Sequence, residues 1–129
     1  MKKSLFALIV LAAALSAGTA CSSKASKGGG GTKLKGRFEV AGMCSNYTFS
    51  VIEGRINPML VEATWTNPQT NKTYWKAFGI SNPCNFPSNI KEGDTFYFEI
   101  VPADKEQKCA VCMAYYPTPG KKLNIKVVQ

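Results

Sequence analysis

The residues best suited to carry out chemistry in this 129-residue chain are its five cysteines, and the chain contains no histidine. Without histidine, Ser-His-Asp and Cys-His catalysis and every metal site that requires imidazole are excluded. Cys109 and Cys112 form a Cys-x-x-Cys motif, the spacing used in thiol–disulfide exchange. That chemistry favours a cysteine at a helix N-terminus, whereas this motif lies in sequence with a strand pattern. Redox activity at Cys109 and Cys112 is therefore an alternative interpretation.

A site made of cysteine and methionine is the second kind of chemistry that the sequence allows. Met43 precedes Cys44 and Met113 follows Cys112, and sulfur ligands are those that Cu(I) prefers. A zinc site with four cysteines would need two closely spaced pairs, and the chain has one. Because methionines beside cysteines of a β-sheet commonly fill core space, we expect Met43 and Met113 to be packing residues. We expect no bound metal and no cofactor.

Other catalytic patterns are missing from the sequence. The chain has no glycine motif for dinucleotide or phosphate binding and no nucleophile elbow. Its acidic residues fall in expected turns or on expected solvent faces, and nothing marks one of them as a general acid or base. We therefore expect a protein without enzymatic activity.

The first twenty residues have the order of a secretory signal. Lys2 and Lys3 precede an apolar run over 5–15, and small residues continue to Ala20. The run is too short for a stable membrane span. Ala20 followed by Cys21 resembles the lipobox of bacterial lipoproteins, which implies a diacylglycerol on Cys21 as the mature N-terminal residue. The alternative is ordinary signal-peptide cleavage.

The cysteine count favours lipidation of Cys21. With lipid on this residue four cysteines remain, whereas an ordinary exported chain would keep five and leave one thiol unpaired. By the same resemblance, a serine after the lipidated cysteine gives no inner-membrane retention signal. We expect a cell-envelope protein anchored to the outer membrane. Residues 21–32, rich in serine, lysine and glycine, then form a flexible tether ahead of a domain over 33–129.

The charge of this domain bears on its partners. Without the lysines of the signal and those at the tether, 11 basic and 8 acidic residues remain, a net charge of +3. So small an excess is weak evidence for nucleic-acid binding, and we expect no nucleic-acid partner. The expected partners are the membrane, through Cys21, and an envelope protein or glycan.

The domain has the pattern of short strands. Residues alternate between apolar and polar with a period of two; for example, Phe49 and Val51 are expected to face inward and Thr48 and Ser50 outward. With turn residues between them, the predicted strands cover 33–40, 47–51, 61–66, 74–80, 95–101, 109–116 and 123–127. The predicted fold class is all-β, a small OB-like Greek-key barrel of five to seven strands. An immunoglobulin-like β-sandwich is the runner-up.

Several short motifs carry a family resemblance. They are Met43-Cys44-Ser45-Asn46-Tyr47, Asn85-Phe86-Pro87 leading to Lys91-Glu92-Gly93-Asp94, and Cys112-Met113 before a final Ile/Val strand. Over residues 34–129 the chain resembles small uncharacterised bacterial lipoproteins of the Bacteroidota type. The resemblance implies an OB-like barrel and a disulfide from a cysteine near the end of the first strand to one near the last two strands. It implies no reaction.

The other four cysteines are expected to form two disulfides. In an exported chain each bridge contributes about 2–4 kcal/mol to stability. A bond between Cys109 and Cys112 is disfavoured, because residues three apart in a strand point to opposite faces. The family resemblance implies the pair Cys44–Cys112, which leaves Cys84 with Cys109.

Aromatic residues give the best indication of a binding surface. Tyrosines and tryptophans outnumber what one small core needs, and strand alternation turns some of them outward. Trp75, Tyr97 and Tyr115 are the candidate ligand-binding residues, suited to stacking on sugar or peptide. The simpler alternative is that these rings cover the barrel ends. A partner protein is favoured over a glycan, because the chain is too small to enclose a large pocket.

Overall fold

The structure is a computed structural model that describes residues 31–103 and 109–129. The predicted signal and Cys21 lie outside these residues. Within them the chain forms strands and short 3-10 turns, as the all-β prediction requires. In chain order they are β1 (Leu34–Gly42), η1 (Met43–Ser45), β2 (Asn46–Glu53), η2 (Pro58–Leu60), β3 (Glu62–Thr66), β4 (Thr73–Ile80), η3 (Pro83–Asn85), β5 (Thr95–Ile100), β6 (Lys122–Leu123) and β7 (Ile125–Val128). In this part of the chain, no helix has the length and apolar character needed to cross a membrane.

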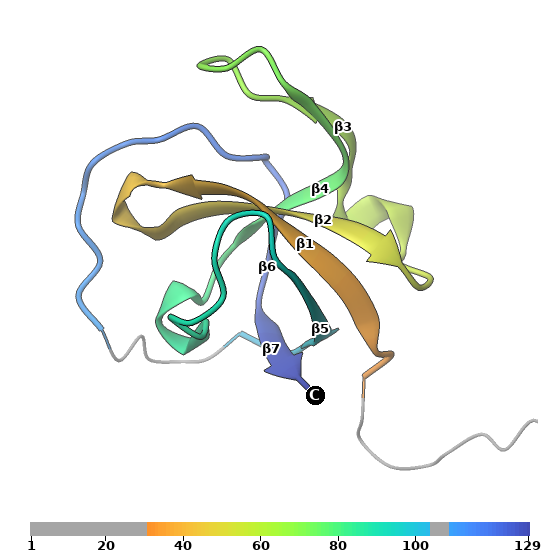
Figure 1. The fold of residues 1–129 in the computed structure, drawn as a ribbon. Coiled ribbons are helices and arrows are strands. Elements are labelled where there is room, and N and C mark those ends of the chain that lie inside the picture. The colour runs from red at the N-terminus through yellow and green to blue at the C-terminus, as the bar shows by residue number, and fades with distance from the viewer. Residues whose placement is uncertain (1–30, 104–108) are drawn as a thin grey trace, which may run out of the picture.

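The strands form one curved, barrel-like sheet (Figure 1). β1 lies between β2 and β5, β2 pairs with β4, and β3 extends the sheet as the hairpin partner of β4. The C-terminal segment returns between β4 and β5, where β6 is parallel to β4 and β7 is antiparallel to β5. This is the strand order of the predicted OB-like Greek-key fold. Since the described strands belong to a single sheet, the runner-up prediction of an immunoglobulin-like β-sandwich is wrong.

Phenylalanine fills the inside of the curved sheet. Phe49, Phe78 and Phe98 have no exposed surface. The ring centre of Phe78 lies 5.6 Å from that of Phe49 and 5.5 Å from that of Phe98. Gly36 on β1 leaves room for this packing, because a Cβ there would lie 3.0 Å from the ring of Phe98. The period-two prediction is confirmed for the inward residues of β1 and β5.

Residues 81–94 close one end of the barrel. Phe86 follows η3, and its ring lies 5.4 Å from that of Phe38 and 5.0 Å from that of Phe49. Ile90 packs against the same core. The two prolines of this segment, Pro83 and Pro87, cannot donate to a ladder, so the segment can pack as an irregular cap without adding a strand.

A side chain extends the pairing between β4 and the C-terminal segment, a junction that we call the seam. Backbone pairing between them ends at Leu123, whose carbonyl accepts from the N–H of Ser81 at 2.8 Å. One step further, the Asn82 amide donates from Nδ2 to the carbonyl of Ile125 at 2.8 Å and accepts from the Ile125 N–H at 2.9 Å. The amide of Asn82 therefore takes the place of a peptide group, and the sheet approaches a barrel without a continuous closed ladder.

Two expectations about local structure are wrong. Residues 109–116 do not form a strand, because this stretch makes no ladder with the sheet. Thr48 and Ser50 alternate with core residues, yet both are buried on the outer face. Thr48 lies opposite Gly79, over which the side chains of Thr118 and Lys122 pack. A later segment therefore covers part of the outer face.

We expect Asn82→Asp to lower the free energy of unfolding by about 2–3 kcal/mol at neutral pH, because an ionised carboxylate cannot donate to the buried Ile125 carbonyl. Denaturant unfolding measures this difference. Asn89→Asp, at an exposed position of the cap, is the matched control and should change stability by less than about 0.5 kcal/mol. Equal stability of the two variants would show that the Asn82 amide does not hold the seam.

Candidate functional site

Both disulfides hold the segment that follows residue 108. Cys44 is bonded to Cys112 and Cys84 to Cys109, with Cα atoms 5.0 Å and 5.6 Å apart. This is the pairing expected from the sequence. The two cysteines of the Cys-x-x-Cys motif are thus bonded to different elements, Cys112 to η1 at the β1–β2 hairpin and Cys109 to η3 in the cap. The motif connects two parts of the barrel surface and contains no bond of its own.

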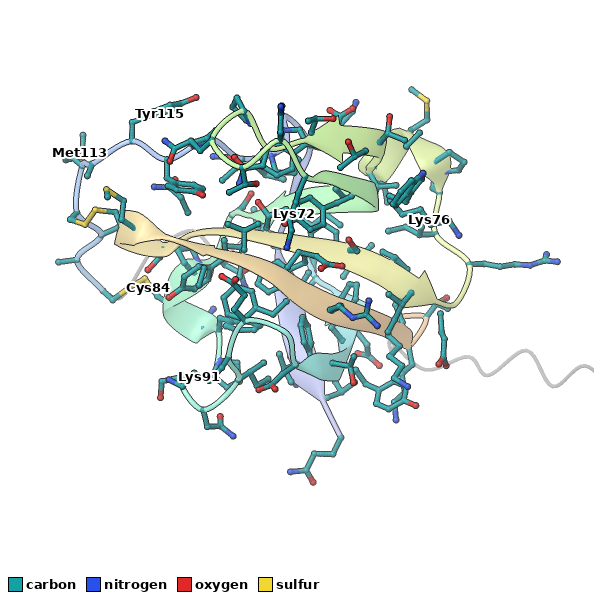
Figure 2. The ribbon with its side chains drawn as sticks, turned by 45° about the horizontal axis from the view of Figure 1, so that its top comes forward. Lys72, Lys76, Cys84, Lys91, Met113 and Tyr115 are labelled. Atoms are coloured by element: carbon teal, nitrogen blue, oxygen red, sulfur yellow. A yellow bond between two sulfur atoms is a disulfide. The ribbon has the colours of Figure 1, made fainter. Side chains whose placement is uncertain are left out.

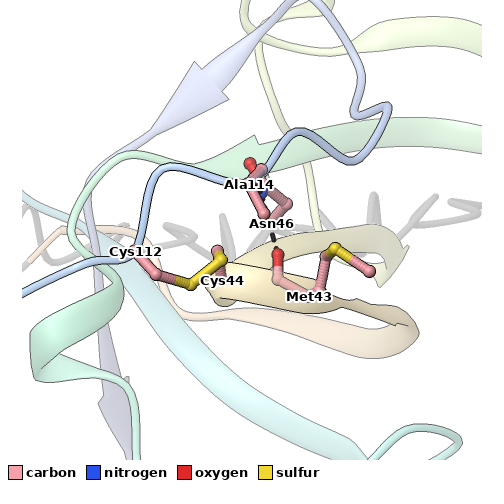
Figure 3. Close-up of a disulfide and its surroundings, with 5 residues drawn as sticks. All are labelled: Met43, Cys44, Asn46, Cys112 and Ala114. Carbon is pink, nitrogen blue, oxygen red and sulfur yellow. Dashed lines mark hydrogen bonds between the residues drawn. A yellow bond between two sulfur atoms is a disulfide. The ribbon is translucent and has the colours of Figure 1, made fainter.

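The β1–β2 hairpin ends in an unusual turn. Cys44 and Ser45 have φ values of 55° and 59°, in the left-handed region that non-glycine residues rarely adopt. The next residue, Asn46, donates from Nδ2 to the carbonyl of Met43 at 2.8 Å and to that of Ala114 at 3.1 Å. Asn46 therefore joins the two chain segments that the Cys44–Cys112 bond also joins (Figure 3).

Tyr116 provides a further attachment. Its ring lies against Gly42, where an added Cβ would be 2.6 Å from Cδ1 of the ring. Its hydroxyl accepts a hydrogen bond at 3.2 Å from Nδ2 of Asn67, a buried residue of the β3–β4 turn. The disulfide, Asn46 and Tyr116 together fix residues 112–116 along the hairpin, although no β-ladder does so.

The residues between these attachments point into solvent. Met113 is 98% exposed and Tyr115 is 83% exposed, and Figure 2 shows both at the edge of the molecule. Met43 and Val111, beside the two bonded cysteines, are also exposed. We call these four residues the tip surface: Met43, Val111, Met113 and Tyr115. The expectation that Met43 and Met113 fill the core is wrong, because the disulfide lies at the surface and not in the barrel.

The other two candidate aromatic residues lie on the outer face of the sheet. Trp75 on β4 is 66% exposed. Tyr97 on β5 is separated from β4 by β1 and β2, a distance of about 14 Å across three strand spacings. The Tyr97 ring is covered by cations, with Nζ of Lys33 4.5 Å and Nζ of Lys35 5.6 Å from its centre. Trp75 is therefore the candidate with an open ring, whereas Tyr115 lies outside the strands, on the segment after residue 108 (Figure 2).

A groove of about 280 Å³ borders Trp75. Arg37 and Glu39 of β1, Ser50 of β2 and Tyr74 of β4 contribute to its walls. Burial raises the pKa of Tyr74, and the nearby carboxylates of Glu39 and Glu92 and the hydroxyl of Tyr116 raise it further. The Tyr74 hydroxyl therefore stays protonated through neutral pH. The sequence does not distinguish these neighbours, because the strand pattern marks them only as solvent-facing residues.

No cluster of three or more histidine, cysteine or acidic side chains suited to a metal occurs in residues 31–103 and 109–129. Comparisons of the chain with protein-family models, with curated proteins and with solved structures find no match. The geometry of the tip surface and of the groove is thus the basis for inferring function.

We expect the double substitution of Cys44 and Cys112 by serine to lower the free energy of unfolding by about 4 kcal/mol, because the bond closes a loop of 68 residues. Denaturant unfolding measures the loss. Peptide mapping without reduction should still detect the bond between Cys84 and Cys109. A stability within about 1 kcal/mol of the unsubstituted protein would mean that Asn46 and Tyr116 hold the segment without the disulfide.

Proposed function

We propose that this protein is a non-enzymatic binding module of the bacterial cell envelope, anchored to the outer membrane by lipid on Cys21, whose tip surface binds a partner protein. The observation that carries the proposal is the exposure of Met113 and Tyr115 on a segment held by a disulfide and by Asn46. Exposed methionine and tyrosine are favoured in protein interfaces, because they offer large apolar area. A fixed segment also loses little conformational entropy on binding.

The position of the tip surface supports the same proposal. β1 begins at Leu34, next to the point where the tether enters the domain, and ends at Gly42 beside the tip. Its nine residues span about 26 Å, and Figure 1 shows the β1–β2 hairpin end on the opposite side from the start of β1. A domain tethered through its N-terminal side would therefore present Met113 and Tyr115 away from the membrane.

A thiol–disulfide or Cu(I) role for Cys109 and Cys112 is a weaker proposal. Both sulfurs are already in bonds, each to a different element of the barrel. A role in exchange would require breaking a bond that holds the tip surface in place. Glycan binding is supported by a different surface, the groove that borders Trp75.

The lipid anchor has a direct test. Cys21→Ala should release the protein from the membrane fraction after cell lysis, because the expected anchor is the lipid attached to the Cys21 sulfur. Mass spectrometry of the N-terminal peptide should detect acylation of Cys21 in the unsubstituted protein. An unacylated Cys21 in protein purified from native membranes would contradict the anchor.

The tip surface is tested by photocrosslinking in intact cells. A photoreactive benzoylphenylalanine at Met113 should give a discrete adduct with one protein, and Met43→Glu should reduce its yield several-fold by adding a charge to an apolar contact. Met59, 72% exposed on η2 at the other end of β2, is the matched control position. Equal adducts at Met113 and Met59, or none at either, would refute the proposed interface.

A further inference from the structure

The groove beside Trp75 lies on the outer face of the sheet, away from the tip surface. Its floor crosses β1, β2 and β4, whose backbone groups are engaged in ladders. An extended peptide that bound by strand addition would need a free sheet edge, which this floor lacks. A ligand in the groove must therefore be held by side chains.

Those side chains offer both signs of charge and an unused hydroxyl. Arg37 and Glu39 lie two residues apart on β1, about 6.6 Å along the strand, and neither forms an ion pair within the part of the chain that the structure describes. Ser50 is 4% exposed as a residue, and its buried hydroxyl has no hydrogen-bond partner among the described residues. A buried hydroxyl without a partner is costly, and a ligand that bonds to it would recover that cost.

The exposed indole of Trp75 adds a flat apolar surface to this polar set. Its neighbour Tyr74 is held by stacking on Trp65, with ring centres 6.0 Å apart and planes at 24°. The groove thus combines a ring surface, a cation, an anion and a hydroxyl within about 280 Å³. This volume is below the roughly 300–1,000 Å³ of pockets that enclose a drug-sized ligand, so one small ring fits and the rest of a longer ligand would extend outside.

We propose that this groove binds a pyranose unit of a polysaccharide, with the apolar face of the sugar on Trp75 and its hydroxyls on Arg37, Glu39 and Ser50. A sugar ring has one apolar face and hydroxyls that both donate and accept, which matches this set of groups. A nucleic acid or a phosphate would favour several cations, whereas Glu39 opposes Arg37 here. The proposal is independent of the tip surface, with which the groove shares no residue.

The test is an NMR titration of the full acylated protein in a detergent without a sugar headgroup. Chitotetraose is the probe for an amino-sugar chain of the cell wall, and cellotetraose and maltotetraose are the probes for neutral polysaccharide. At millimolar concentrations we expect at least one of them to shift the indole N–H of Trp75 and the amides of Arg37 and Ser50. Which probe binds identifies the class of glycan.

Substitutions assign the binding to the groove. Trp75→Ala should weaken it at least tenfold, or about 1.4 kcal/mol, and Ser50→Ala should weaken it several-fold while retaining the dispersed spectrum of a folded protein. Met59→Ala removes an exposed apolar side chain outside the groove and should leave affinity unchanged. The proposal is overturned if no probe shifts these signals, if Met59→Ala weakens binding as much as Trp75→Ala, or if only an extended peptide or a DNA oligonucleotide shifts them.

Discussion

The side-chain amide of Asn82 makes hydrogen bonds to the Ile125 backbone at the point where this sheet would otherwise be open. The C-terminal segment has to pair with β4 on one side and with β5 on the other, and it changes partner at Asn124 between β6 and β7. At that change the backbone of Ile125 would lose its partners on the β4 side. The side-chain carbonyl and amide of Asn82 supply one acceptor and one donor in the required order. Both groups are buried, so leaving them unpaired would cost about 1–3 kcal/mol each.

The sheet leaves residues 109–116 without a ladder of their own. That segment is held by covalent bonds and by side chains that reach it from the barrel, Cys44 and Asn46 from the hairpin and Asn67 through Tyr116. Such a segment is not required to bury alternate residues in a core. Met113 and Tyr115 can therefore remain exposed while the backbone that carries them stays in place.

The sequence predicted the elements that obey a period of two. The inward residues of β1 and β5 and the phenylalanine core follow directly from that alternation. Residues 109–116 show why the same pattern can mislead. Inward attachments at Cys112 and Tyr116 alternate with outward Met113 and Tyr115, which is the spacing of a strand, but Asn46 and a disulfide replace the ladder. An alternating sequence identifies an extended backbone and does not identify its partner.

What the sequence could not predict depends on contacts between distant segments. The roles of Asn82 and Asn46 require knowing which carbonyls lie within reach, and asparagine in an irregular segment carries no such information. The burial of Thr48 arises from chain that crosses the outer face far later in sequence. The aromatic excess did indicate Trp75, but its neighbours Arg37 and Glu39 look like any solvent-facing pair on a strand.

The two surfaces of the module differ in how they are supported, and this bears on how they can work together. The groove is built on the most extensively paired strands, so its geometry is maintained by the core itself. The tip surface depends on the bond between Cys44 and Cys112 and on hydrogen bonds from Asn46. β1 contributes to both, with Arg37 and Glu39 in its middle and Gly42 at the tip. The groove and the tip surface share no residue, so a ligand in the proposed groove would leave the side chains of the proposed partner surface free for contact.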